Sequence, residues 1–201
     1  MIRVLVADDE HLIREALVAL LELTDDIEVV GQAASGDEAL TLGLRLAPDV
    51  AVLDLQMPGL SGTEVAAELA ERLPGCVCVI VTSHGLPGHL KHALAGGVRG
   101  FVPKTVTGAR LAEVIRTVHS GARYVDPGLA ADAIAAGDSP LTPREADVLQ
   151  AAEGGAPVEE IAVRVHLSSG TVRNYLSSAI GKLHAATRHE AVRIARERGW
   201  I

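Results

Sequence analysis

The sequence predicts an α/β domain with a five-stranded parallel, doubly wound sheet, followed by an all-α domain of four helices. Over residues 1–120, short β-rich runs alternate with helical patterns, an order typical of a parallel sheet covered by helices on both faces. From residue 140 onward only helical patterns occur. We therefore expect two domains, at residues 1–120 and 140–201, joined by a linker at 121–139.

The five expected strands are nearly continuous apolar runs, as strands buried on both faces of a parallel sheet require. They lie at residues 2–8, 27–34, 50–55, 76–83 and 100–104. The helices that follow them are expected at about 11–23, 36–46, 62–72, 88–95 and 108–120. In such sheets, functional groups gather outside the carboxyl ends of the strands. The residues that end each strand are therefore the first candidates for a site.

The composition indicates a globular protein with a core of small residues. A hydrophobic fraction of 48% is enough for a core, and because only 2% of the residues are aromatic, Ala, Val and Leu must fill it. No apolar run reaches membrane-spanning length, and the opening "MIRVLVADDEH" lacks a signal-peptide pattern. Cys76 and Cys78 are interpreted as small apolar residues on one face of a strand, in preference to a metal or redox pair. We expect a cytoplasmic protein with no membrane partner.

The charge is divided unevenly along the chain. A net charge of −8, taken as a whole, argues against a nucleic-acid-binding protein. However, residues 1–139 carry 10 Lys and Arg against 19 Asp and Glu, whereas residues 140–201 carry 8 against 7. The acidic excess therefore lies entirely in the first two-thirds of the chain.

The linker and the tail carry clear helix signals. The linker composition, rich in Ala, Gly, Asp and Pro, predicts a short helix flanked by flexible chain. The first tail helix has Thr142 as its N-cap, Pro at its first position and Glu145 three residues later, which is a capping-box pattern. A short helix, a longer helix after a Ser cap and a final helix follow. A tight turn separates the second from the third.

Polar and charged residues end four of the expected strands, which are neighbours at one edge of a doubly wound sheet. They are Asp8, Asp9 and Glu10 after the first strand, Asp54 at the third, Thr82 and Ser83 at the fourth, and Lys104 at the fifth. Each alone is more often a cap or a loop acid, but together they point to a site. Clustered carboxylates need a cation, and hard oxygen ligands suit Mg²⁺. Such a cation, the ammonium of Lys104 and the hydroxyl of Thr82 would make Asp54 a nucleophile that accepts a phosphoryl group.

These residues, with the motif "DLQMPGLSG", resemble the flavodoxin-like receiver domain of two-component response regulators over residues 1–120. The resemblance implies that Asp54 is phosphorylated and that Mg²⁺ is the cofactor. It further implies the following roles: Asp9 as a direct metal ligand, Asp8 acting through water, the carbonyl of Gln56 as the third protein ligand, Thr82 and Lys104 as the phosphoryl-binding pair, and Phe101 as the switch aromatic. One departure is that Thr105, not the usual proline, follows Lys104.

The tail has the pattern of a helix-turn-helix, with a scaffold helix at about 158–165 and a recognition helix at about 168–183. On the recognition helix, an apolar stripe should face the core, formed by Val172, Leu176, Ile180 and Leu183. The exposed face should then carry Thr171, Arg173, Asn174 and Ser177. Arg reads guanine and Asn reads adenine in a major groove, and Lys182, Arg164 and Arg188 suit phosphates. The alternative is an ordinary helical bundle with a solvated charged face.

The tail motifs favour DNA binding over that alternative. The segments "LTPREADVL", "EEIAVRVHLSSGTVRNYLSSAIGKL" and "RHEAVRIARERGWI" resemble the LuxR/NarL/FixJ-type domain over nearly all of residues 140–201. The usual Lys-x-His after Thr-Val is replaced by Arg173-Asn174-Tyr175, so the operator should differ from those of better-known members. The run "GTVRNYLSSAI…KL…GWI" also resembles regulators of membrane-lipid desaturation.

The sequence thus predicts a phosphorylation-activated transcriptional regulator. A sensor histidine kinase would phosphorylate Asp54, a homodimer would form, and two tails would bind promoter DNA. Two alternatives to this function are a phosphatase and a regulator that is not phosphorylated. A Mg²⁺-dependent phosphatase would carry an Asp two residues after its nucleophile, where this chain has Gln56; enzymatic activity beyond phosphotransfer to Asp54 and autodephosphorylation is therefore not expected. A regulator that works without phosphorylation would not need the intact acidic set.

Overall fold

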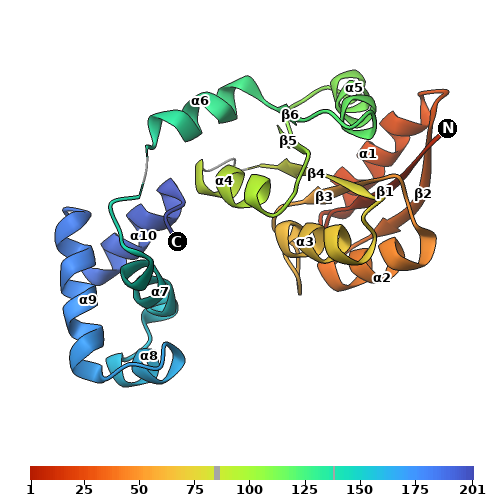
Figure 1. Ribbon diagram of the computed structural model, residues 1–201. Coiled ribbons are helices and arrows are strands. Elements are labelled where there is room, and N and C mark those ends of the chain that lie inside the picture. Colours follow the sequence, from red (N-terminus) through yellow and green to blue (C-terminus); the bar gives the residue numbers. More distant parts are fainter. Residues whose placement is uncertain (84–86, 138) are drawn as a thin grey trace. The chain divides into compact units, whose positions relative to one another are not determined.

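The computed structural model describes residues 1–83, 87–137 and 139–201. They form two compact units, one made up of residues 1–83 and 90–130 and the other of residues 87–89 and 131–201 (Figure 1). No helix in these ranges has both the length and the apolar character needed to cross a membrane. Each unit is described by itself below.

The first unit is built on a six-stranded, all-parallel sheet with the order β2-β1-β3-β4-β5-β6. The strands are β1 (Ile2–Ala7), β2 (Ile27–Ala33), β3 (Val50–Asp54), β4 (Val77–Thr82), β5 (Gly100–Pro103) and β6 (Tyr124–Val125). The helices are α1 (His11–Glu22), α2 (Gly36–Leu46), α3 (Gly62–Arg72), α4 (Pro87–Ala95) and α5 (Gly108–His119). The predicted α/β alternation is confirmed, with helix bounds within about one residue of those expected.

The sheet is covered on both faces, with α1 and α5 on one side and α2, α3 and α4 on the other (Figure 1). On one face, valines of the strands, such as the buried Val4 and Val52, pack against α1 and α5. Ile115 of α5 is fully buried in this layer. The other face carries Leu5 and Phe101, which are equally buried. As the composition required, small aliphatic residues dominate this core. Cys76 and Cys78 are both buried; Cys78 lies in β4 and Cys76 directly precedes it.

The expectation of five strands was wrong by one, because β6 extends the sheet at the β5 edge. Its pairing rests on backbone hydrogen bonds, from Tyr124 N to Arg99 O and from Asp126 N to Phe101 O, both at 2.9 Å. A strand of two half-buried residues has no alternating apolar pattern, so the sequence did not reveal it. It lies in the expected linker, whose predicted short helix is α6 (Pro127–Ala135). Residue 138 of that linker lies outside the described residues.

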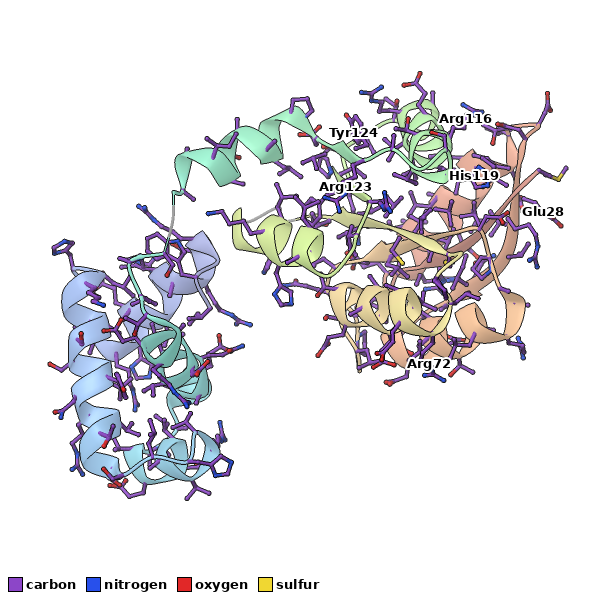
Figure 2. All side chains as sticks on the ribbon, viewed as in Figure 1. Glu28, Arg72, Arg116, His119, Arg123 and Tyr124 are labelled. Carbon is purple, nitrogen blue, oxygen red and sulfur yellow. The ribbon has the colours of Figure 1, made fainter. Side chains whose placement is uncertain are left out.

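Two arginines of α5 connect the helix to the edges of the sheet. Arg116 forms a bidentate pair with Asp26, in the turn before β2, at 2.7 Å for both contacts. Arg110 stacks over the ring of Tyr124 on β6, with its guanidinium carbon 4.7 Å from the ring centroid, and donates to the Tyr124 hydroxyl at 3.0 Å. Figure 2 shows Arg116 on α5 and Tyr124 on β6. These contacts tie both outer strands of the sheet to one helix.

The second unit is helical, as predicted. Its elements are α7 (Pro143–Ala151), a 3₁₀ turn (Glu153–Gly155), α8 (Val158–Arg164), α9 (Ser169–Lys182) and α10 (Arg188–Arg198). Thr142 and Glu145 form the expected capping box, and Ser168 caps α9 through the backbone N–H of Thr171. The stripe of α9 faces the core as expected, with the addition of buried Ala179 and with Ile180 only partly buried.

Gly62, at the first position of α3, should not tolerate a side chain. A Cβ on this residue would lie 2.1 Å from the carbonyl oxygen of Asp54, so the loop after β3 would have to move. We predict that Gly62→Ala lowers the free energy of unfolding by about 1–3 kcal/mol, measured by urea denaturation. Gly75→Ala is the control, because a Cβ there meets no atom within 4 Å; its effect should stay within about 0.5 kcal/mol. Equal effects of the two substitutions would contradict the prediction.

Candidate functional site

The carboxyl ends of β1, β3, β4 and β5 meet at one edge of the sheet, because these four strands are neighbours in the sheet order. The register places Asp54 beside Val81 and Thr82 beside Pro103. A cavity of about 250 Å³ opens at this edge. It is lined by Asp9, Glu10, Asp54, Gln56, Thr82, Ser83 and Lys104. The structure thus brings the predicted set together around one cavity, except for Asp8, which is buried beside it.

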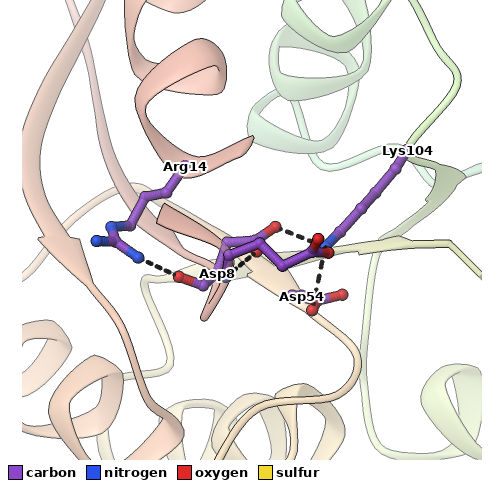
Figure 3. A network of polar contacts seen from close by, with 5 residues as sticks. Asp8, Arg14, Asp54 and Lys104 are labelled. Carbon is purple, nitrogen blue, oxygen red and sulfur yellow. Dashed lines mark hydrogen bonds and ion pairs between the residues drawn. The ribbon is translucent and has the colours of Figure 1, made fainter. Parts of the chain in front are cut away.

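The ammonium group of Lys104 lies at the centre of the site. Its Nζ is 2.8 Å from Asp8 Oδ2, 3.1 Å from Glu10 Oε1 and 3.2 Å from Asp54 Oδ2. Figure 3 shows Lys104 reaching across to Asp8 and Asp54. Its backbone N–H also donates to Thr82 O at 2.8 Å, which fixes the chain after β5 against β4. The ammonium of Lys104, which follows β5, therefore joins carboxylates from the ends of two other strands, β1 and β3.

Asp8 is held from three directions. Its side chain is 1% exposed and carries the ion pair to Lys104. Its Oδ1 accepts from the backbone N–H of Glu10 at 2.9 Å, and its carbonyl oxygen accepts from Arg14 Nη1 at 2.5 Å (Figure 3). Arg14 belongs to α1, so the position of Asp8 depends on both the sheet and the helix that follows β1.

Burial and charge act in opposite directions on the central pair. Burial raises the pKa of Asp54; the Lys104 ammonium opposes this, and the neighbouring Asp8 carboxylate adds to it, so that the pKa is raised overall. Burial lowers the pKa of Lys104, but the carboxylates of Asp8, Glu10 and Asp54 outweigh it and raise the pKa of the ammonium well above its usual range. Lys104 therefore stays charged, whereas burial disfavours the charged form of Asp54.

The site can also hold a divalent cation. One carboxylate oxygen each of Asp8, Asp9 and Asp54 lies within 4.8 Å of the other two. Asp9 is exposed and lines the cavity. Carboxylate oxygens at this spacing suit a hard cation that keeps part of its water shell. Gln56, whose carbonyl was the expected third protein ligand, is exposed and lines the same cavity.

Thr82 and Phe101, the expected switch residues, are both buried, at 2% and 0% exposure. Both side chains therefore lie inside the first unit. The peptide bond between Lys104 and Thr105 is trans, since no described residue follows a cis bond.

Glu10 is a residue of the site to which sequence analysis gave no role. Its carboxylate contacts Lys104, lines the cavity and remains half-exposed. The available signal was its position directly after the paired aspartates at the end of β1. That signal did not specify whether its side chain turns toward the site or toward solvent.

On α9, the residues expected to read bases are on the accessible face. Arg173, Asn174 and Ser177 are exposed, and Thr171 is half-buried beside the capping Ser168, with their hydroxyls 2.8 Å apart. Arg173 Nη2 lies 3.4 Å from Glu159 Oε1, a residue of α8. Both side chains of this pair are more than 60% exposed, so the contact contributes little to stability.

The three residues expected to contact phosphates all have partners within the unit. Lys182 Nζ lies 2.7 Å from Glu145 Oε2. Arg188 donates to the carbonyl oxygens of Ala156 and Gly155, at 2.9 and 3.3 Å. Arg164 pairs with Glu160 on its own helix. Lys182 and the half-buried Arg188 therefore have structural roles that the sequence did not indicate.

Glu145 joins α7 to the recognition helix. It is 4% exposed, and its carboxylate accepts from the backbone N–H of Thr142 at 2.6 Å, from Ser178 Oγ at 2.7 Å and from Lys182 Nζ at 2.7 Å. Burial raises the pKa of Glu145, but these donors outweigh burial and lower the pKa to about 2. From the sequence, only the capping box could be predicted. The contacts of Glu145 with Ser178 and Lys182, which are distant in the sequence, depend on the packing of α7 against α9.

A parallel sheet with an acidic, lysine-containing carboxyl edge, followed by a helix-turn-helix unit, defines the class of two-domain response regulators. The chain matches the family of response regulator receiver domains over residues 4–116. It matches the luxR family of bacterial regulatory proteins over residues 139–195.

Relatives over the full length agree with both matches. The chain is 41% identical, over 203 residues and 100% of both chains, to the uncharacterized transcriptional regulatory protein YvfU of Bacillus subtilis (strain 168). It is 38% identical, over 201 residues and again 100% of both, to transcriptional regulatory protein DesR of the same strain. The crystal structure of response regulator ChrA, from a heme-sensing two-component system, aligns with a TM-score of 0.60 and 28% identity over 100% of this chain and 98% of that one.

The chain therefore belongs to the LuxR-type response regulators, which are transcriptional regulatory proteins of two-component systems. This is a family of regulators and not of classical enzymes, so the phosphatase alternative is not supported.

The Glu145 network should make the second unit sensitive to acid. The pKa is about 2 in the folded protein against an ordinary 4.5, so the stabilisation is complete above about pH 4.5 and is lost as pH falls toward 2. We predict that Glu145→Gln lowers the free energy of unfolding at pH 7 by about 1–2 kcal/mol. The difference in this free energy between variant and wild type should become smaller below pH 4.5. Urea denaturation followed by fluorescence reports this unit, since Trp200 is the single tryptophan of the chain.

The control for this experiment is Asp147→Asn, which removes an exposed carboxylate from the same helix, where it lies 3.6 Å from Arg144. It should change stability by less than about 0.5 kcal/mol at every pH. A Glu145→Gln gap that stays constant from pH 7 to pH 3 would show that the carboxylate charge is not the source of the stabilisation.

Proposed function

We propose that Asp54 accepts a phosphoryl group from a sensor histidine kinase, with Mg²⁺ in the adjacent acidic cluster, and that this controls dimerisation and promoter binding. The observation that carries the proposal is the contact of Asp54 with Lys104 at 3.2 Å inside a cavity that also contains Thr82. A nucleophilic carboxylate, a fixed ammonium and a hydroxyl are the groups that phosphoryl transfer requires.

Transfer from phosphohistidine forms one bond and breaks one. An Asp54 oxygen attacks phosphorus, the P–N bond to the imidazole breaks, and the electron pair and a proton from solvent leave with the histidine. Thr82, at the end of β4, and Lys104, directly after β5, stabilise the negative charge on the phosphoryl oxygens. A divalent cation held by Asp8, Asp9 and Asp54 would neutralise further charge at the phosphoryl group. Water attack on the same phosphorus returns Asp54 to its free form.

Self-association is supported by the surface of α1. Leu12 and Leu20 are 78% and 42% exposed, and Leu23, which caps the helix, is 80% exposed. Their spacing of eight and eleven residues places them along one face. An exposed apolar face on a helix that begins at the acidic site suits a second copy of this chain, whose tail would supply the second half-site contact on DNA.

DNA binding is assigned to the exposed face of α9. Arg173 and Asn174 lie within the first two turns, where side chains of a recognition helix meet base edges. The contact of Arg173 with Glu159 is weak enough to be exchanged for a base. Because Lys182 and Arg188 are engaged within the unit, they anchor this face and contribute to affinity mainly through its geometry.

Asp54 should be the single phosphorylation site. After incubation with acetyl phosphate and Mg²⁺, the intact mass of the full chain should rise by one phosphoryl group in wild type and not in Asp54→Ala. Asp9→Ala should be labelled weakly, with little response to Mg²⁺, because it removes one oxygen of the metal cluster. Equal labelling of Asp54→Ala and wild type would disprove the assignment.

Arg173 should determine base preference at one position. Duplexes selected from a random-sequence library by the phosphorylated full chain provide the reference sequence. Parallel selection with Arg173→Ala should relax the preference at one base pair, a loss of about 1–3 kcal/mol of discrimination. Arg196→Ala, which removes the same charge from α10, is the control and should keep the wild-type preference. An unchanged preference in Arg173→Ala would remove α9 from base reading.

A further inference from the structure

The ammonium of Lys104 faces as many carboxylates as it has N–H donors, and its side-chain hydrogen bond goes to Glu10 at 3.1 Å. An ammonium has three N–H donors. Three carboxylate oxygens lie within 3.2 Å of Nζ, one each from Asp8, Glu10 and Asp54. A phosphoryl oxygen on Asp54 would therefore compete with Glu10 for the donor of Lys104 that is already in use.

Of the three carboxylates, Glu10 is the one that can leave. The side chain of Asp8 is 1% exposed and accepts a second hydrogen bond from the Glu10 backbone, so its release would leave a buried charge without compensation. Asp54 is the acceptor itself and stays in the site. The side chain of Glu10 is 56% exposed, so its carboxylate regains water as soon as it turns away.

Charge drives the same exchange. Glu10 lines the cavity together with Asp54 and Thr82, so it faces the space in which the phosphoryl group forms. That group brings about −1.5 to −2 charges. Two anions that compete for one ammonium repel each other across a few ångströms, and the exposed, longer side chain is the one that moves.

We propose that Glu10 sets the rate at which Asp54 accepts phosphoryl groups, because its carboxylate occupies the Lys104 donor that the incoming phosphoryl oxygen needs. It is a positioning residue that acts through Lys104. In the unphosphorylated protein Glu10 holds the ammonium; in the phosphorylated protein it lies in solvent. This inference deepens the proposed function and rests on Asp54 being the acceptor.

The test is the rate of Asp54 phosphorylation by acetyl phosphate with Mg²⁺, followed by intact mass in the full chain. Glu10→Gln and Glu10→Ala should raise the rate constant about threefold to fivefold, the range expected for releasing one partly exposed ion pair. Raising the salt concentration should shrink this difference, because salt screens an exposed pair. The matched control is Glu15→Gln, which removes an equally exposed carboxylate from α1 that pairs with His11 outside the cavity; its rate should match wild type.

A second measurement does not depend on turnover. Beryllofluoride, a phosphoryl analogue, should bind Glu10→Gln about threefold to fivefold more tightly than wild type, observed by fluorine NMR. Rates and affinities of the Glu10 variants equal to or below wild type would overturn the inference while leaving Asp54 as the acceptor. A wild-type chain that gains no phosphoryl group would instead overturn the proposed function itself.

Discussion

The arrangement of strand ends in the first unit depends on how its buried carboxylates are stabilised. Asp8 and Asp54 are both under 10% exposed, and an isolated carboxylate in such a place would be strongly destabilising. Lys104 compensates both at once, and its side chain is itself 9% exposed. Because its backbone is held to β4 and its ammonium reaches residues after β1 and β3, one lysine fixes the relative positions of three strand ends. The geometry around Asp54 and the local stability therefore both depend on Lys104.

The second unit also contains a buried carboxylate, but there one carboxylate is surrounded by several donors. Here a single buried carboxylate, Glu145, is compensated by donors from the chain before α7 and from α9. The recognition helix is thus fixed near its C-terminus by charge and at its N-terminus by the Ser168 cap. Its exposed face is positioned by these contacts and by the apolar stripe, and not by the residues that face outward.

Much of the fold followed from periodicity, because buried parallel strands and capped amphipathic helices leave strong patterns. The acidic site followed from topology, since the ends of neighbouring strands must meet at one edge. What could not be predicted depends on side-chain paths. Glu10 could turn toward Lys104 or away from it, and Lys182 lies on an exposed helical position yet reaches across to Glu145. Strand β6 is too short to show an alternating apolar pattern, and it pairs with β5 through its backbone.

The separation of the two faces of α9 has a consequence for how such regulators diverge after gene duplication. If Arg173, Asn174 and Ser177 read bases, the positions that decide which promoter is recognised carry almost none of the burden of folding. A duplicated copy could drift at these positions and acquire new target genes without losing its structure. Lys182 and Glu145 have no such freedom, because a change at either removes the partner of a charge at the junction of two helices. Regulatory networks built from this domain can therefore be rewired through a few surface codons, while the scaffold changes slowly.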